Sequence, residues 1–305
     1  MIDSVQLNFS PTSLTVLNII LALVMYGIAL DLEVEDFKRV VLEPRGIAVG
    51  LTSQLVLLPA MTCLLAYLID PAPSLALGMV LIAACPGGNM SNFFTHLGRG
   101  NTGLSITMTS FVTLGAVVFT PLNFSFWGSL LPSAQEMLRG LSLDPLRMMR
   151  VVGLIIIVPT AAGMWTRARR PDLADRMLRP FKIGSMIVFA AFIAIALFNN
   201  FGPFLEYLDS FFLIVIAHNA LALSIGFGTA TAAGLATADR RAVTMEVGIQ
   251  NAGLGLLLIF NFFGGSGGMA LVAAWWGLWH LVAGLTLGSI WARREPEPEP
   301  ALASD

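Results

Sequence analysis

The chain has 305 residues, of which 56% are apolar and 12% are charged, and its formal net charge is −2. Soluble domains carry about 25% charged residues, so this composition indicates a membrane protein. A chain of this length has room for about nine or ten membrane helices of about 20 residues each. No basic patch with interleaved aromatic residues appears, which argues against nucleic-acid binding.

Apolar segments long enough to span a membrane recur along the whole chain, which predicts an all-α polytopic membrane protein with a single transmembrane domain over residues 1–305. The nine predicted spans are 13–32, 45–69, 73–97, 101–131, 147–168, 181–200, 208–236, 242–263 and 269–292. Continuity of the fourth span is open because it contains Pro121. The first residues lack a basic region, so we expect no cleaved signal peptide. The Glu- and Pro-rich tail 295–305 is expected to be disordered.

The distribution of basic residues predicts the orientation of these spans. If the N-terminus lies outside, the inside segments hold all but three of the 17 Lys and Arg residues, the exceptions being Arg139, Arg147 and Arg150. Because Lys and Arg collect on the cytoplasmic side, we expect the N-terminus outside and the C-terminus in the cytoplasm. The short loops and the arginine-rich side fit a bacterial inner membrane.

Glu246 is the only carboxylate deep inside an apolar stretch of helix length. A charged carboxylate at the centre of a bilayer costs about 2.5–3.5 kcal/mol or more, so such residues are paired. No Lys or Arg lies in any other deep apolar stretch, and we therefore expect the partner to be a mobile cation. This pattern predicts an ion-coupled membrane transporter.

Two apolar segments are interrupted by glycine and polar residues, at 85–92 in the third span and at 246–253 in the eighth. Pro86 removes an amide donor and disfavours helix just before it, whereas the second interruption has no proline. Broken helices at membrane depth line cavities, where their carbonyls and N-termini can hold ions. One break on each side of the basic segment 167–182 predicts an inverted-repeat transporter with one unpaired helix.

Polar side chains follow each break. Ser105 and Thr109 are four residues apart on one helix face and can offer two oxygens to one hard cation. Such hydroxyls also bond their own helix, but together with Glu246 and the polar residues of the first break they favour a cation site. His280 follows the second break, and a histidine on an apolar helix is often only a packing residue.

The two interruptions resemble the motifs of the bile acid:sodium symporter family. The resemblance rests on residues 84–92, 99–101, 104–110 and 246–251, and it extends over nearly the whole chain, including 27–32 and Gln54 near Pro59. It implies a sodium-coupled secondary symporter that imports an organic anion, such as a bile acid, by alternating access.

The resemblance also implies how the spans are arranged. It implies a core domain whose two broken helices cross near the midplane, and a panel domain beside it. By this analogy the core holds about 73–131 and 242–292, and the panel holds about 13–69 and 147–236. Nine spans are similar to the animal-type members, whereas some bacterial members have an extra first helix. We expect a monomer in the lipid bilayer.

Members of the family bind two sodium ions, and the resemblance implies both sites here. Sodium site 1 would be formed by Ser91, Asn92, Ser105, Thr109 and Glu246. Sodium site 2 would be formed by Gln54, Glu246 and Gln250, with the backbone carbonyls of Val247 and Ile249. The substrate-facing residues would be Asn89, Asn251 and His280. For Gln54 an interhelical hydrogen bond is an open alternative, and Leu281 departs from the Asn that some bacterial relatives carry beside the histidine.

The expected mechanism follows from charge. Two Na⁺, the Glu246 carboxylate and a monovalent anion sum to zero, which lowers the barrier to a rigid-body movement of core against panel. The anion's head would lie near Asn89 and Asn251, and its apolar body between core and panel. Other loads remain open, including pantoate-like acids, sulfated steroids and other carboxylates, as do proton coupling and sodium-independent transport.

Other classes of function have less support in the sequence. Residues 264–268 match G-x-S-x-G, but they lie in a short loop rather than in a strand-turn-helix elbow, and no zinc-protease motif is present. We therefore expect no enzyme activity. Cys63 and Cys85 are expected to be small buried hydrophobic residues, which leaves little basis for arsenite transport. A sensor without transport would need a signalling domain, and we expect none.

Overall fold

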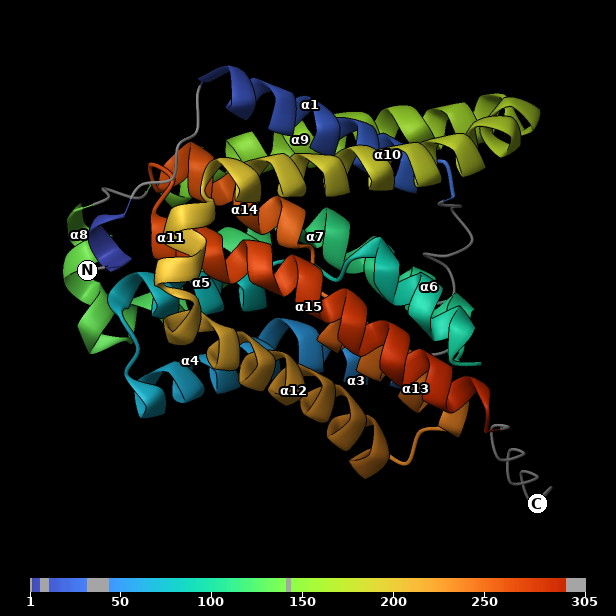
Figure 1. The fold of residues 1–305 in the computed structure, drawn as a ribbon. Coiled ribbons are helices and arrows are strands. Elements are labelled where there is room, and N and C mark those ends of the chain that lie inside the picture. Colours follow the sequence, from blue (N-terminus) through green and yellow to red (C-terminus); the bar gives the residue numbers. More distant parts are fainter. Residues whose placement is uncertain (1, 6–10, 32–43, 141–143, 295–305) are drawn as a thin grey trace.

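The structure is a computed structural model that describes residues 2–5, 11–31, 44–140 and 144–294; the predicted tail 295–305 lies outside the described residues. Within them every named element is a helix (Figure 1). Six are long and apolar enough to cross a membrane: α1 (Pro11–Ala29), the continuous α3–η2–α4 (Pro44–Ile69), α7 (Thr102–Ser129), α9 (Pro145–Arg169), α12 (Leu208–Ala232) and α15 (Gly267–Ala292). The chain is thus a polytopic membrane protein, as predicted.

Two shorter apolar helices belong to the interrupted segments. They are α5 (Pro73–Ala84), which is followed by α6 (Asn89–Leu97), and α14 (Ala252–Phe262), which is preceded by α13 (Thr237–Gly248). The remaining helices are η1 (Ile2–Ser4), η3 (Pro132–Ala134), α8 (Gln135–Gly140), α10 (Pro171–Asn199) and α11 (Phe201–Glu206). The interrupted segments are therefore each built from two helices, as the sequence predicts.

Three helices lie side by side along one face of the bundle, namely α1, α9 and α10 (Figure 1). Tyr26 on α1 shares a hydrogen bond of 3.1 Å with Thr166 on α9, and its ring centroid lies 5.3 Å from that of Phe181 on α10. Gly163 on α9 has no room for a side chain, because a Cβ there would lie 2.7 Å from the carbonyl oxygen of Tyr26. These contacts make α1, α9 and α10 one packed group.

On the opposite face, α12 packs against the interrupted helices (Figure 1). A Cβ at Gly226 would lie 2.8 Å from the Cα of Thr244, so the backbones of α12 and α13 come close together. His218 on α12 is linked to Thr62 on α4 at 2.8 Å and lies against the ring of Trp276 on α15, with centroids 4.6 Å apart. The helix α4 packs against α5, α7 and α12, and α12 packs mainly against α13 and α15.

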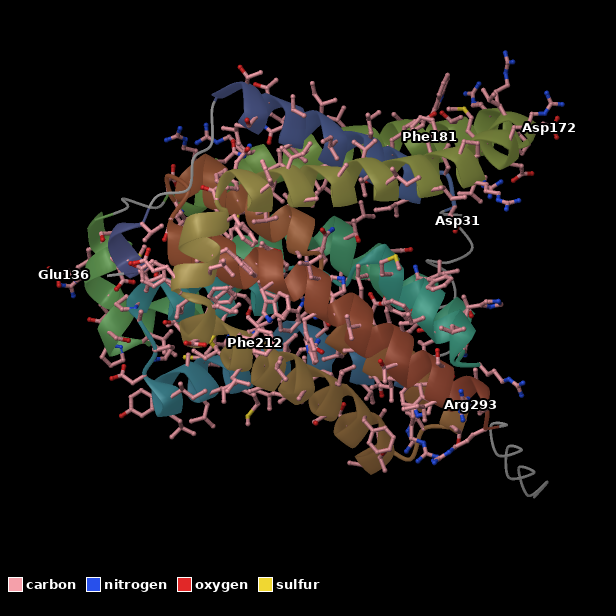
Figure 2. All side chains as sticks on the ribbon, viewed as in Figure 1. Asp31, Glu136, Asp172, Phe181, Phe212 and Arg293 are labelled. Carbon is pink, nitrogen blue, oxygen red and sulfur yellow. The ribbon has the colours of Figure 1, made fainter. Side chains whose placement is uncertain are left out.

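The ends of the bundle can be followed in Figure 2. Asp31, Asp172 and Arg293 lie at one end, and Glu136 lies at the opposite end. The end of α1, the turn between α9 and α10 and the end of α15 thus share one end of the molecule. This is the grouping of basic segments that the alternation of spans predicts.

Two details of the predicted spans differ from the structure. Pro121 does not interrupt the fourth span, because α7 continues through it. The eighth span begins earlier than expected, so Arg240 and Arg241 belong to α13 instead of a loop. Arg241 is only 6% exposed and donates to the carbonyl oxygen of Gly98 at 2.8 Å. A prediction from apolar runs misses such a polar first turn, since the turn is held by neighbouring backbone.

Candidate cation site at the crossing of two interrupted helices

The first interruption is an extended backbone segment after α5. Cys85 has φ −71° and ψ 154°, the conformation that the ring of a following proline, here Pro86, favours. The carbonyls at the end of α5 are satisfied by side chains from other helices: Thr120 donates to Ala84 at 2.8 Å, and Gln54 donates to Cys85 at 3.3 Å. Since α6 begins at Asn89, the break is narrower than predicted.

The second interruption lies between α13 and α14. Ile249 is extended, with φ −116° and ψ 95°. There is no proline, but the side chain of Asn251 accepts a hydrogen bond from the amide of Leu254 at 3.0 Å and so caps the new helix. This break is also narrower than predicted, because Glu246 and Gly248 still belong to α13.

The two interruptions cross and pair with each other as a short antiparallel bridge. Two backbone hydrogen bonds make up the pairing: Gly88 N–H donates to Ile249 at 2.8 Å, and Asn251 N–H donates to Pro86 at 2.9 Å. They place Gly87 opposite Gln250. Each broken helix thereby satisfies part of the other's backbone, which a membrane interior requires. The predicted crossing of two broken helices is present.

Glu246 is fully buried, at 0% exposure, in the last turn of α13 beside this crossing. Its carboxylate accepts from three hydroxyls: Ser91 on α6, at Oε2; Ser105 on α7, 3.3 Å from Oε2; and Thr109 on α7, 2.8 Å from Oε1 and 2.9 Å from Oε2. Within the described part of the chain, no Lys, Arg or His forms an ion pair with it.

Acceptor oxygens outnumber the available protons around Glu246. The hydroxyl of Thr109 also lies 3.1 Å from Oδ1 of Asn92, and the hydroxyl of Ser105 lies 2.7 Å from the same atom. Each hydroxyl has a single proton, so it can serve only one of these acceptors at a time. An excess of convergent oxygens is the ligand environment that hard cations prefer. All five residues predicted for sodium site 1 are brought together.

The first break approaches the Glu246 carboxylate directly. A Cβ built on Gly87 would collide with Oε1 and would lie 2.8 Å from the carboxyl carbon. Only a residue without a side chain lets the carboxylate lie this close to the crossing. The carboxylate is therefore held between the extended backbone of the first break and the hydroxyls of α6 and α7.

Gln54 lies in the π-helical turn η2 (Ser53–Leu57) of the second span, 1% exposed. Pro59 at the start of α4 cannot donate a backbone hydrogen bond, and the amide of Leu58 instead bonds to the carbonyl of Ser53. Such π-turns are frequent at functional sites. The local irregularity turns Gln54 toward the crossing.

Gln54 and Gln250 form a reciprocal pair of amides. Nε2 of Gln54 donates to Oε1 of Gln250 at 2.7 Å, and Nε2 of Gln250 donates back at 3.2 Å. Gln250 also donates to the carbonyl of Val247 at 2.7 Å. Three members of the predicted sodium site 2 thus meet, while Ile249 bonds to the first break and Glu246 makes no hydrogen bond to this pair in the described structure.

Within what the structure describes, the predicted substrate residues do not form a cluster like those of the sodium sites. Asn89 is the first residue of α6, and its side chain lies outside what the structure describes. Asn251 uses its side chain to cap α14. His280 on α15 is 6% exposed, and its Nδ1 has no hydrogen-bond partner among the described residues. No hydrogen bond joins His280 to Asn251 in the described part of the chain.

Sequence reasoning missed two buried polar residues on α12. His218 contacts Thr62 and Trp276 as described above, and Asn219 donates to the carbonyl of Gly248 at the end of α13, at 2.7 Å. A signal was available, because the His-Asn pair separates the apolar runs 211–217 and 220–223. Buried polar residues inside membrane spans deserve a functional hypothesis.

An apolar groove of about 470 Å³ lies between the second span and α7. Val56 and Phe126, which help to line it, are 52% and 57% exposed. Among the described residues that line this groove, none is a predicted sodium or substrate residue. Its position on the outer face does not connect it with the cation site.

Comparisons with known proteins show which proteins this chain is similar to. The model of the sodium bile acid symporter family matches residues 18–206. The chain is 29% identical over 278 residues to YocS, a sodium-dependent transporter of Bacillus subtilis, covering 91% of this chain and 83% of that protein. It is 26% identical over 283 residues to a probable sodium/metabolite cotransporter of Arabidopsis thaliana, chloroplastic BASS1, covering 91% and 67%. It is 29% identical over 248 residues to the human ileal sodium/bile acid cotransporter, covering 79% and 67%.

Proposed function

This chain belongs to the sodium bile acid symporter family and is a sodium-coupled solute symporter rather than an enzyme, and on that premise we propose that it takes up a small organic anion together with two Na⁺. The observation that carries the proposal is the environment of Glu246. Its buried carboxylate is surrounded by hydroxyl and amide oxygens, without an ion pair in the described residues. A negative charge in such a place calls for a cation.

We assign the first Na⁺ to Glu246 and the oxygens around it. The hydroxyl groups of Ser91, Ser105 and Thr109 can rotate so that their protons point to acceptors other than the carboxylate. Their oxygen lone pairs are then free to bind the ion. Asn92 supplies a further oxygen, which lies within hydrogen-bond distance of two of these hydroxyls. Oxygen ligands of this type suit Na⁺ better than a soft metal.

The second Na⁺ is assigned to the amide pair on the other side of the crossing. Gln54 and Gln250 each have a carbonyl oxygen there, and the carbonyl of Val247 lies within 2.7 Å of the Gln250 amide. Binding requires the reciprocal amide pair to open so that its oxygens face the ion. Glu246 and the carbonyl of Ile249 complete the proposed set, and the position of the carboxylate against Gly87 supports its sharing between two ions.

The proposed load is a monovalent organic anion of the bile acid type. Its head would lie near Asn89, Asn251 and His280, close to the start of helices α6 and α14, whose N-terminal dipoles favour negative charge. The names of the relatives include a metabolite cotransporter and a bile acid cotransporter. Other carboxylates, pantoate-like acids and sulfated anions are the alternative loads.

The lengths of the helices support an inverted repeat. The segment α3 to α7 runs as a long helix, a 12-residue helix, a short helix and a long helix, and the segment α12 to α15 repeats this order. In both segments the 12-residue helix, α5 or α13, ends at the crossing. We pair α1 with α10 in the same way, which leaves α9, the fifth of the nine spans, without a counterpart.

Packing favours a smaller panel than the family analogy first implied. We propose that α1, α9 and α10 form the panel, because Tyr26 links all three. The second span and α12 belong with the core in this proposal, since Gln54 and Asn219 bond to the ends of α5 and α13. Rigid-body movement would then separate the two groups without breaking the crossing, which keeps the cation ligands together.

We propose that the end of the molecule with Asp172 and Arg293 faces the cytoplasm. The neighbouring segments hold most of the arginines, among them Arg167, Arg169 and Arg170 at the end of α9. Positive charge collects on the cytoplasmic side of membrane proteins. The N-terminus would then lie outside, in a multi-pass protein of the bacterial inner membrane that acts as a monomer.

Uptake into proteoliposomes tests this function. The full-length protein is reconstituted, and a panel of labelled anions (a conjugated bile acid, pantoate, a sulfated steroid) is offered with an inward gradient of Na⁺ or of choline. We expect one anion at least to accumulate only with Na⁺. Accumulation that follows a proton gradient equally well in choline, with no effect of Na⁺, would contradict the proposal.

A further inference from the structure

We propose that Asn219 is a positioning residue for sodium binding. It holds the end of α13 at the second break by a hydrogen bond, as Gln54 holds the end of α5 at the first break. This inference rests on the proposed function, because it concerns the sodium site assigned above. The observation behind it is a pair of hydrogen bonds, one at the end of each interrupted helix. Gln54 donates to the carbonyl of Cys85, and Asn219 donates to the carbonyl of Gly248.

These two bonds occupy corresponding places in the two halves of the chain. Gln54 belongs to the long helix before α5 and precedes its acceptor by 31 residues. Asn219 belongs to the long helix before α13 and precedes its acceptor by 29 residues. Both side chains are amides, both are 1% exposed, and both reach a carbonyl where the helix turns into extended backbone. In each half, an amide of the preceding span therefore fixes the end of the interrupted helix.

The side chain of Asn219 makes a hydrogen bond that fixes the carbonyl of Gly248. Its Nδ2 lies 2.7 Å from the Gly248 oxygen, while its Oδ1 is buried and has no hydrogen-bond donor among the described residues. An amide that leaves its own oxygen unpaired in an apolar helix costs free energy. The orientation of the amide is set by Gly248, because a carbonyl can only accept.

Gly248 is the link between the two backbone carbonyls assigned to the second Na⁺. Val247 precedes it and Ile249 follows it, so the orientation of the Gly248 carbonyl limits the rotation of the peptide planes on both sides. Leu223 on α12 fills the space where a side chain of Gly248 would lie. Without Asn219, Gly248 loses the hydrogen bond that holds its carbonyl toward α12. The peptide planes beside it can then rotate and displace the carbonyls of Val247 and Ile249 from the positions that their bonds to Gln250 and Gly88 give them.

The test is sodium binding to the purified full-length chain, with radioactive Na⁺ alone as the probe. Asn219→Leu and Asn219→Ala both remove the donor, but one keeps the side-chain volume and the other leaves a cavity. We expect both variants to raise the Na⁺ concentration that gives half-saturation by about five- to tenfold, which corresponds to the loss of one hydrogen bond. The number of ions bound at saturation should not change. Thr62→Val is the matched control, because it removes the buried hydrogen bond to the adjacent His218 and should change half-saturation less than about twofold.

Each result decides the matter. Unchanged Na⁺ affinity in the leucine and alanine variants overturns the inference, and so does an equal weakening in the Thr62→Val control. A weakening that appears only in Asn219→Ala reports a cavity and also overturns it. If the leucine variant does not yield monodisperse protein, the alanine variant is compared with Ala222→Gly, a cavity control on the same helix, and must exceed it. Failure of the wild-type protein to bind Na⁺ would instead contradict the proposed function itself.

Discussion

Gly87→Ala adds one methyl group at the point where the first break meets the Glu246 carboxylate. The new Cβ would collide with Oε1 and would lie 2.8 Å from the carboxyl carbon and 3.3 Å from the Glu246 backbone oxygen. Ordinary contacts are about 3.5–4.0 Å, so the carboxylate has to retreat by roughly 1 Å. Such a shift takes it out of hydrogen-bond distance of Ser91 or Thr109.

The expected loss can be derived from one such bond. A hydrogen bond to a charged group contributes about 1.5–3 kcal/mol, and about 1.4 kcal/mol corresponds to a tenfold change in an equilibrium constant. We therefore expect Gly87→Ala to raise the Na⁺ concentration that gives half-saturation at least about tenfold. Na⁺-dependent uptake in proteoliposomes and binding of radioactive Na⁺ both measure this concentration.

The adjacent glycine provides the control. A Cβ at Gly88 would meet its nearest atoms, in Gln250 and Asn251, at 3.4–3.7 Å, which is ordinary contact. Gly88→Ala should therefore keep nearly the sodium affinity of the wild-type protein. Equal effects of the two substitutions, or an unchanged affinity in Gly87→Ala, would refute the reasoning from close approach.

Two further predictions concern the proposed ligands. Thr109→Val keeps the side-chain shape and removes the hydroxyl that lies within 2.9 Å of both carboxylate oxygens, so Na⁺ affinity should fall about tenfold or more; Ser110→Ala, which removes only a bond to its own helix, should leave it unchanged. Gln54→Leu and Gln250→Leu should each abolish one of the two Na⁺ bound at saturation, and the double variant should lose no more than either single one. Additive losses in that cycle would contradict a shared site.

The two breaks and the buried acid could be predicted from the residues themselves, whereas their crossing was implied only by the family resemblance. Pro86 with its neighbouring glycines marks the first break, and a lone carboxylate in an apolar run marks the second. The exact extent of the second break was not predictable from its glycines. Its helix restarts because Asn251 caps α14, and such a cap can be recognised only once the backbone direction is known.

Contacts between spans that are far apart in the chain are harder to predict from the sequence. Nothing in the spacing joins Gln54 to Gln250 or Asn219 to Gly248, because each contact depends on how separate spans pack together. The packing of α12 against α13 was not predictable from the sequence for the same reason. Apolar runs report that a segment spans the membrane, but they do not report which neighbour its small and polar residues meet, as Gly226 meets α13.

The most direct test of the whole account is sodium binding and sodium-stimulated uptake in Glu246→Gln. This substitution keeps the shape of the side chain and removes only its charge, while Glu206→Gln, at an exposed residue of α11, serves as the control. We predict that Glu246→Gln protein reaches the membrane in normal amounts but shows neither saturable Na⁺ binding nor Na⁺ stimulation of uptake. Sodium binding and stimulation equal to those of the wild-type protein would contradict the claim that this buried carboxylate holds the driving ion.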